Sequence, residues 1–287
     1  MAIRYLSYNQ IDKAKWDALV LKSADGLPYS HSNYLNQICE WGALVKDDYV
    51  AVMALPFSKK VGQKYIYTPF MVQQLGIISS DDEDASEWQK MIPNQFKLIE
   101  YNSNEIYPFG EEQVNTVLDL NEGYENLRSK FSSNHKRNLK KIAELTINKV
   151  SIDEVFDLFI ANKGSEIKGF DSAGLERLKC LIKDTPFEWE IEGAYFEENL
   201  VCGVVWLKTS GRIIFLFSGN SEKGKSTGAM LYLINEKIKA LSKSHLKMDF
   251  EGSNNANLAR FYKGFGGRHC VYGKYKRYLF PVNLIKK

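Results

Sequence analysis

Small and basic residues gather between two predicted elements, a strand at residues 212–217 and an amphipathic helix at residues 229–241. The first N–H groups of a helix and its dipole attract phosphate, and the lysines of this segment add positive charge. The segment predicts a phosphate-binding loop made of Ser218, Gly219, Lys223, Gly224, Lys225, Ser226, Thr227 and Gly228. It lacks the upstream glycine of a Walker A motif. The ordinary alternative is a strand-to-helix turn, which favours Gly, Ser and Thr without binding a ligand.

A second polar cluster follows the predicted strand at residues 246–250. Apolar and polar residues alternate along this strand, which places Asp249 and Glu251 on one face. Asn255 then begins a short predicted helix that carries Phe261 and Tyr262 and is followed by glycines. Acidic residues on a strand are usually solvated or salt-bridged, and an aromatic side chain on a short helix usually belongs to the core.

The order of strand, Asn255, short helix, Phe261-Tyr262 and Gly266 resembles the last motif of the GNAT superfamily of acyltransferases. The closing Phe265-Gly266-Gly267 and the basic segment Ser133–Lys141 are similar to the FemAB-like branch, peptidoglycan-bridge-type enzymes with two GNAT-like units. The resemblance implies an α+β, GNAT-like (acyl-CoA N-acyltransferase) fold, with mixed, mostly antiparallel sheets flanked by helices.

The resemblance also implies a chemistry. In such enzymes an acyl thioester or an aminoacyl ester lies between two splayed strands, and an amine attacks its carbonyl group. Tyr262 would protonate the leaving group, Asp249 and Glu251 would act as a base or bind an ammonium substrate, and Asn255 would help to bind the donor. The implied reaction moves an acetyl or aminoacyl group from acetyl-CoA, another acyl-CoA or aminoacyl-tRNA to a small-molecule or peptide amine. The alternative is a catalytically inactive GNAT-like protein that binds a nucleotide, a tRNA or an anionic envelope precursor.

The elements that must position these residues fall into two mixed halves, which we expect to be a GNAT-like unit at residues 1–120 and an acyltransferase unit at residues 121–287. In the first half the patterns predict helices at 11–22 and 32–41 and strands at 49–55, 65–68, 97–101 and 116–120. In the second half they predict strands at 189–196, 200–208, 212–218 and 246–250, two more near 268–272 and 275–280, and helices at 153–162, 172–183, 229–241 and 256–263.

Two further groups of residues could bind a substrate. Tyr67, Gln73 and Gln74 flank an unusual turn, and two adjacent amides with aromatic neighbours would suit a polar ligand in an interdomain groove. The alternative is that these amides satisfy buried backbone groups at the turn. Lys136 and Arg137 belong to a basic helix that could hold a polyanion such as tRNA or a lipid-linked pyrophosphate, or that could be only a solvated face.

Composition limits the class of protein. The chain has 287 residues, 44% hydrophobic and 25% charged, with a net charge of +3, which is typical of a globular protein of about two domains. The four cysteines are far apart and form no C-x-x-C motif, so we expect reduced thiols, no disulfide scaffold and no metal site. The sequence shows neither a signal peptide nor an apolar run long enough for a transmembrane segment, and we expect a cytoplasmic location.

Overall fold

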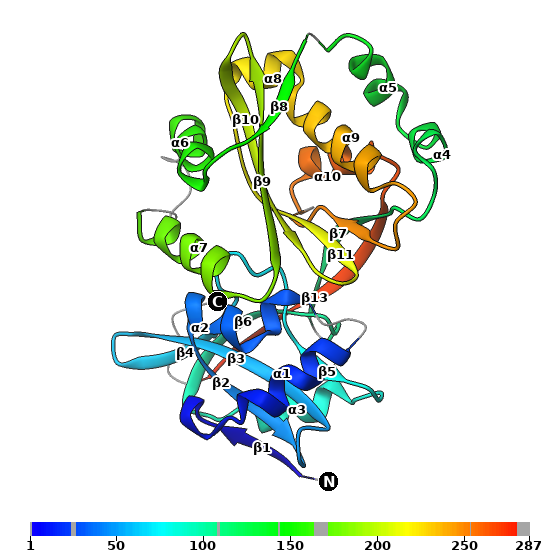
Figure 1. The fold of residues 1–287 in the computed structure, drawn as a ribbon. Helices are drawn as coiled ribbons and strands as arrows, with labels where there is room; N and C mark the ends of the chain where they lie inside the picture. Colours follow the sequence, from blue (N-terminus) through cyan, green and yellow to red (C-terminus); the bar gives the residue numbers. More distant parts are fainter. Residues whose placement is uncertain are drawn as a thin grey trace. The chain divides into compact units, whose positions relative to one another are not determined.

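The computed structural model describes residues 2–23, 27–107, 110–142, 144–163, 172–252 and 254–279. The chain forms two compact units (Figure 1). Unit 1 contains Met1–Gln113 and Val271–Lys287, and unit 2 contains Val114–Cys270. The division into GNAT-like units at residue 120 stays a prediction. None of the helices in the described part of the chain is both long and apolar enough to cross a membrane.

Unit 1 is a mixed sheet with short helices. Its strands follow the order β1-β2-β3-β4-β6-β13, with β5 paired to β3, and every pairing is antiparallel except that of β4 with β6. The strands are β1 (Ile3–Leu6), β2 (Glu40–Lys46), β3 (Ala51–Lys60), β4 (Gln63–Tyr67), β5 (Ile77–Ser79), β6 (Phe96–Ser103) and β13 (Arg268–Tyr278). The helices are η1 (Tyr8–Gln10), α1 (Lys13–Lys22), η2 (Pro28–Ser30), α2 (Ser32–Ile38) and α3 (Ala85–Met91).

Unit 2 has strands in the order β7-β12-β11-β10-β9-β8, with only β11 and β12 parallel. This confirms the prediction of a mixed, mostly antiparallel sheet. The strands are β7 (Glu111–Asp119), β8 (Thr146–Lys149), β9 (Glu188–Phe196), β10 (Asn199–Lys208), β11 (Arg212–Asn220) and β12 (Lys247–Asp249). The helices are α4 (Tyr124–Ser129), α5 (Ser133–Leu139), α6 (Ile152–Lys163), α7 (Ser172–Asp184), α8 (Glu222–Thr227), α9 (Ala229–Leu241) and α10 (Ala256–Lys263).

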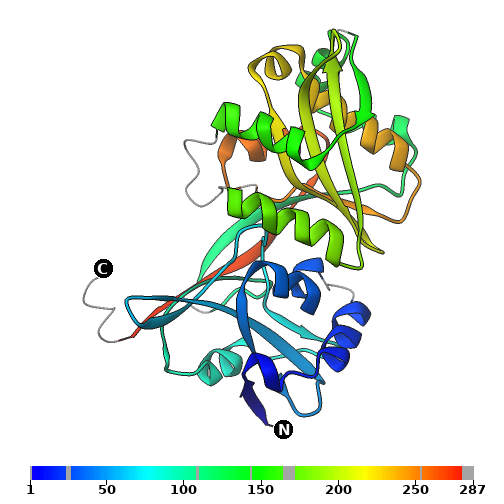
Figure 2. The ribbon, with the colours of Figure 1, turned by 60° about the vertical axis from the view of Figure 1, so that its left-hand side comes forward.

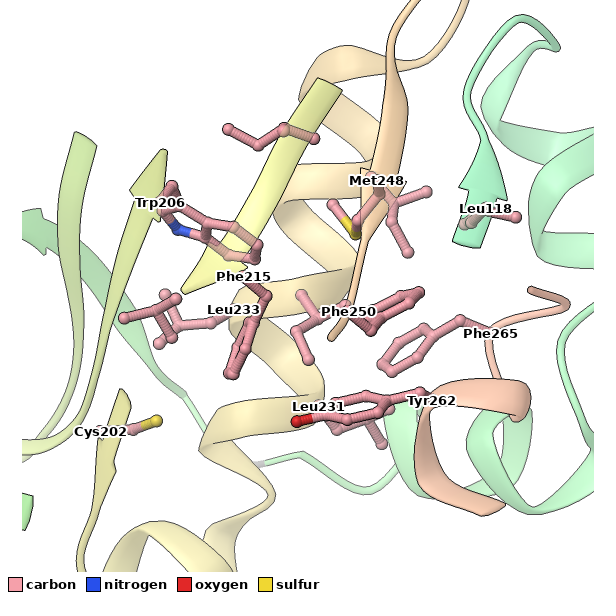
Figure 3. Packing of buried hydrophobic residues seen from close by; sticks show 14 of the residues in the cluster. Leu118, Cys202, Trp206, Phe215, Leu231, Leu233, Met248, Phe250, Tyr262 and Phe265 are labelled. Atoms are coloured by element: carbon pink, nitrogen blue, oxygen red, sulfur yellow. The ribbon is translucent and has the colours of Figure 1, made fainter. Parts of the chain in front are cut away.

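Helices cover both faces of the central strands of unit 2, and both ribbon views show β9 and β10 between α6 and α9 (Figures 1 and 2). The pleat explains this arrangement, because neighbouring residues of a strand point to opposite faces. Cys202, Val204 and Trp206 belong to the core that includes the apolar side of α9 (Figure 3). Gly203 lies on the other face, where a Cβ atom would come within 2.6 Å of Val155 in α6.

Three local predictions were wrong. Residues 219–228 are not one loop, because β11 continues to Asn220 and α8 follows before the single left-handed residue Gly228. The two C-terminal strands are one strand, β13. The helix predicted at 32–41 ends at Ile38, and β2 begins at Glu40. In the first two cases glycines and small polar residues suggested a loop or a break, whereas in the third the helical pattern ran into residues that pair with β3 instead.

Candidate functional site

Strands β11 and β12 diverge after a short parallel pairing. Their ladder contains three residue pairs, from Arg212–Lys247 to Ile214–Asp249. Strand β12 then ends, whereas β11 continues to Asn220. Within the described residues, no strand pairs with the β12-side edge of β11 beyond Ile214. That edge therefore has no neighbouring strand among the described residues, and an extended ligand could lie along it.

A β-bulge lies in the unpaired part of β11. Val205 pairs with Phe217 and Trp206 pairs with Phe215, so Leu216 is an extra residue relative to β10. A bulge bends a strand and redirects its groups, and bulges are common beside binding sites. The bulge therefore lies where β11 leaves β12 and turns its free edge toward open space.

A cavity of about 740 Å³ extends along this edge. It is bounded by β11, α5, α6, the α8–α9 segment and α10. The polar lining residues are Asn134, His135, Asn138, Lys141, Asn162, Ser218, Asn220, Lys225, Ser226 and Thr227. The remaining lining residues are Ile142, Phe159, Phe215, Gly224, Gly228, Met230, Leu231, Leu258, Phe261 and Tyr262. The described lining carries Lys141 and Lys225, the latter paired with Glu222 outside the lining, and no carboxylate, so the cavity suits an anionic ligand with an apolar part.

The predicted phosphate segment contributes one wall of the cavity. Six of its residues line the cavity, namely Ser218, Gly224, Lys225, Ser226, Thr227 and Gly228. Gly228 caps the N-terminus of α9 with φ +76°, and its missing Cβ would meet only Ile142, at 3.3 Å. The first N–H groups of α9 have no partner within the helix. Gly228 is therefore the position where a phosphate could approach the backbone most closely.

The other glycines and lysines of that segment have additional roles in packing. A Cβ atom on Gly219 would lie 2.4 Å from the Val155 carbonyl oxygen, so Gly219 allows α6 to pack on β11. A Cβ atom added to Gly224 would likewise lie 2.3 Å from the carbonyl oxygen of Val201. Lys223 places its Nζ 4.1 Å from the centre of the Phe196 ring, and neither Gly219 nor Lys223 lines the cavity.

Tyr262 closes another side of the cavity. Its ring stacks on Phe250, with centroids 5.0 Å apart and planes at 19°, and only 7% of the residue is exposed (Figure 3). Its ring also lies 5.9 Å from that of Phe215 in β11, between centroids. Burial, with a smaller contribution from the charge of Glu251, raises the pKa of Tyr262, so the hydroxyl stays protonated. A protonated hydroxyl beside the cavity is able to donate a proton to a bound group.

Asn255 does not line the cavity. Its side chain accepts hydrogen bonds from the N–H groups of Asn257, at 3.0 Å, and Leu258, at 3.3 Å. It thereby caps α10, which fixes the helix that carries Tyr262. The geometry favours a positioning role, and direct donor binding by Asn255 stays a prediction.

Asp249 is fully buried and its carboxylate is fully engaged. One oxygen accepts a hydrogen bond from Arg212 at 2.9 Å. The other accepts from the Asn115 side chain at 2.8 Å and from the Glu251 N–H at 3.1 Å. A carboxylate with this many partners is poorly suited to take a proton from a substrate. Its role as a base stays a prediction that this geometry disfavours.

Glu251 lies beyond the end of β12, so the strand alternation that predicted a common face with Asp249 does not extend to it. Its φ of +50° is unusual for a residue with a side chain and is followed by Gly252, also at +50°. Burial raises the pKa of the Glu251 carboxyl well above its ordinary value. A backbone in this strained conformation next to a buried carboxyl is typical of a functional site.

Helix α5 faces the cavity with residues that the sequence analysis did not select. Asn134, His135 and Asn138 of α5 line it together with Lys141 just after the helix, whereas the predicted Lys136 and Arg137 do not. Lys136 donates to the Ser129 carbonyl at 2.6 Å, and Arg137 donates to Asn134 at 2.8 Å. The spacing 134, 138, 141 is helical and could have identified this face.

His135 ties α5 to α10. Its Nε2 lies 2.9 Å from the Phe261 carbonyl oxygen, and its ring packs edge-on against Phe265 at 4.5 Å. Burial lowers the pKa of His135, and the Phe261 carbonyl opposes this only in part. The imidazole is therefore neutral at pH 7 and serves as a structural link beside the cavity.

Tyr67, Gln73 and Gln74 belong to unit 1 and do not line this cavity. The described residues contain no cluster of three or more His, Cys, Asp or Glu side chains placed to hold a metal ion.

Comparison with known proteins identifies the fold. No protein-family model matches the sequence, and no curated protein matches it. The crystal structure of FemX is similar at a TM-score of 0.70 and 10% identity, covering 100% of this chain and 99% of that chain. A tandem GNAT protein from the clavulanic acid biosynthesis pathway matches at 0.53 and 10%, covering 96% and 97%. L-PGS from Bacillus licheniformis matches at 0.51 and 15%, covering 96% and 95%. The predicted GNAT-like fold, similar to that of FemX, is confirmed.

Proposed function

We propose that this protein is an N-acyltransferase whose acyl donor binds in the unit 2 cavity. The observation that carries the proposal is the divergence of β11 and β12, which leaves an unpaired strand edge along a cavity. Lysines line one wall of this cavity, and the protonated Tyr262 lines another. An extended donor can pair with such an edge as an added strand would. The function is general acyl transfer, and the fold shared with a tandem GNAT protein supports it.

The donor is a molecule with both phosphate and an activated acyl group. Gly228 at the N-terminus of α9, together with Lys141 and Lys225, would hold the phosphate groups. Acetyl-CoA, a longer acyl-CoA and aminoacyl-tRNA all meet this description. One structure with the same fold is a tandem GNAT protein described in its AcCoA-free form, which supports a CoA thioester as the first donor to test.

The acyl carbonyl would lie against the free edge of β11 near Leu216. Backbone N–H groups on that edge would stabilise the negative charge that develops on the carbonyl oxygen as the amine attacks. The tetrahedral intermediate then collapses, the bond to sulfur or to the ribose oxygen breaks, and Tyr262 supplies the proton that the leaving group needs. The attacking amine would release its proton to water, because Glu251 does not line the cavity and burial favours the protonated form of its carboxyl.

Donor binding can be tested at Gly228. A Gly228→Val variant places a branched side chain between the phosphate and the N-terminus of α9, and we expect the affinity for acetyl-CoA, measured by calorimetry, to fall at least about tenfold. Gly62→Val is the matched control, because Gly62 has φ +74° and no atom within 4 Å of its missing Cβ. The two variants carry similar backbone strain.

The control should bind acetyl-CoA as the wild type does. If both variants bind the donor equally well, the phosphate site lies elsewhere. If the wild-type protein binds neither acetyl-CoA nor a longer acyl-CoA nor aminoacyl-tRNA, the acyltransferase proposal is wrong. Tight binding of a donor without turnover would favour the inactive GNAT-like alternative.

A further inference from the structure

The segment that connects β4 to β5 in unit 1 is held by its backbone. The Tyr34 hydroxyl donates to the Met71 carbonyl at 2.6 Å, and the Asn102 side chain donates to the Gln73 carbonyl at 2.9 Å. The Leu75 N–H donates to the Asn102 carbonyl at 3.0 Å. Met71 has φ +62°, which is unusual for a residue with a side chain. The segment therefore presents its side chains from a fixed and locally strained backbone.

The side chain of Gln73 is buried without partners. The residue is 7% exposed, and neither its Oε1 nor its Nε2 has a hydrogen-bond partner among the described residues. Two other polar atoms of unit 1 share this property, namely the Oε1 of the adjacent Gln74 and the Tyr29 hydroxyl. Tyr29 is fully buried and packs edge-on against Tyr34, with ring centroids 5.6 Å apart. Tyr34 in turn bonds to Met71, two residues before Gln73, so these polar groups occupy one region of unit 1.

Such a cluster is unfavourable in the free protein. A buried amide without a partner loses its hydrogen bonds to water and gains none in return, so an apolar side chain of the same shape would be more stable there. The segment's own backbone does not use the amide, because the bond from Asn102 reaches the Gln73 main-chain carbonyl. The alternative in which the Gln73 side chain satisfies backbone groups at the turn therefore has no hydrogen bond to support it in the described residues.

We propose that Gln73 is a binding site for an uncharged amide of a ligand. A carboxamide with both atoms free can pair reciprocally with one amide group, since Oε1 accepts the ligand N–H while Nε2 donates to the ligand C=O. The unpartnered Tyr29 hydroxyl and Gln74 Oε1 belong to the same unit and would add a donor or an acceptor if the ligand reaches them. None of these three side chains is charged, which favours a neutral ligand over a carboxylate or a phosphate. The site lies in unit 1 and does not depend on the acyl-transfer proposal.

Replacement of Gln73 by methionine tests whether the unpartnered amide destabilises the free protein. Gln73→Met keeps the length of the side chain and removes both polar atoms, so we expect the melting temperature to rise by about 2–4 °C. Gln89→Met, in α3 of unit 1, is the comparison, and it should raise the melting temperature less, because only its Nε2 is a buried atom without a partner among the described residues.

Binding of an uncharged amide at Gln73 is tested by NMR with N-acetylglycine N-methylamide as the probe. The side-chain NH₂ signals of Gln73 are those that disappear in the Gln73→Met spectrum. We expect them to shift saturably in the wild-type protein as the probe is added, and the affinity to fall at least about tenfold in Gln73→Met but not in Gln89→Met.

Two results would overturn the proposal, and neither depends on acyl transfer. A lower melting temperature for Gln73→Met would show that the amide is already satisfied in the free protein. If no side-chain amide signal of the wild-type protein shifts saturably with the probe, an amide ligand is excluded.

Discussion

Glu251 permits a test of the site that requires no substrate. Burial raises the pKa of this carboxyl well above its ordinary value of 4.5. In the unfolded chain the carboxyl loses its proton near the ordinary value, whereas the folded protein retains the proton to higher pH. Folding is therefore linked to protonation of Glu251, and the perturbation that removes this linkage is Glu251→Gln, which keeps the shape of the side chain and cannot ionise.

The sign and size of the pH dependence of stability that Glu251 causes follow from proton linkage. Between the unfolded and the folded pKa, the native state binds more protons than the unfolded state, so the free energy of unfolding falls as pH rises. The maximum slope for one group is about 1.4 kcal/mol per pH unit. The loss begins near pH 4.5 and is complete above the folded pKa. Glu251→Gln lacks this loss, so its stability relative to the wild type should increase with pH across that window.

The assay is urea unfolding followed by tryptophan fluorescence at several pH values from 4.5 to 8. The quantity to plot is the difference in the free energy of unfolding between wild type and Glu251→Gln. This difference removes the contribution of His135, which changes stability with pH in the opposite direction. The lowered pKa of His135 means that the unfolded state binds the extra proton, so this residue increases stability as pH rises toward its ordinary value of 6.5.

Glu222→Gln is a suitable control, since the Glu222 side chain is 81% exposed. The difference in the free energy of unfolding between Glu222→Gln and the wild type should not change with pH. A flat difference for Glu251→Gln as well would refute the reasoning, because it would mean that Glu251 ionises in the folded protein as it does in water.

Two further predictions concern single side chains. Tyr262→Phe should reduce the acyl-transfer rate about 10²–10⁴-fold, measured with a donor that binds, and change urea stability little, because the ring that stacks on Phe250 is kept. Tyr124→Phe should keep the acyl-transfer rate and lower urea stability, since the Tyr124 hydroxyl donates a hydrogen bond to Asn235 at 2.8 Å. Equal effects of the two variants on the rate would argue against a catalytic Tyr262. Lys237→Met should lower the free energy of unfolding by about 1–3 kcal/mol in urea, because Lys237 is 6% exposed and its Nζ lies 2.5 Å from Glu190 and 2.8 Å from Glu192. Lys239→Met, at a side chain that is 59% exposed, should cost less than about 0.5 kcal/mol, and equal losses would contradict a structural role for the buried lysine.

Elements with strong periodicity were predictable from the sequence. The helix predicted at 229–241 is α9 with the same ends, because its apolar stripe has helical spacing. The three strands of the meander match β9, β10 and β11 within a few residues, since turn residues separate them clearly. The helix at 256–263 is α10, where Asn255 supplies the cap that the sequence suggested.

The candidate site was only partly predictable, because residue type alone does not show what a residue contacts. Gly219 and Gly228 look alike in the sequence, yet Gly219 accommodates α6 and Gly228 opens onto the cavity. The partner of Gly219 is Val155, which is distant in the chain, so no local pattern could separate the two roles. On α5, the charged Lys136 and Arg137 were selected as binding residues, and the polar residues on the other side of the helix line the cavity instead.

The separation of β11 from β12 depends on residues that do not line the cavity. Asp249 forms the last ladder pair with Ile214, and it bonds to Arg212 in β11 and to Asn115 in β7. The same carboxylate accepts the N–H of Glu251, which fixes the turn where φ becomes positive and ends β12. Strand β12 ends before this turn, so the edge of β11 beyond Ile214 begins where Asp249 and its hydrogen bonds hold the last pair of the ladder. The end of the ladder and the turn at Glu251 are thus both fixed by contacts of Asp249.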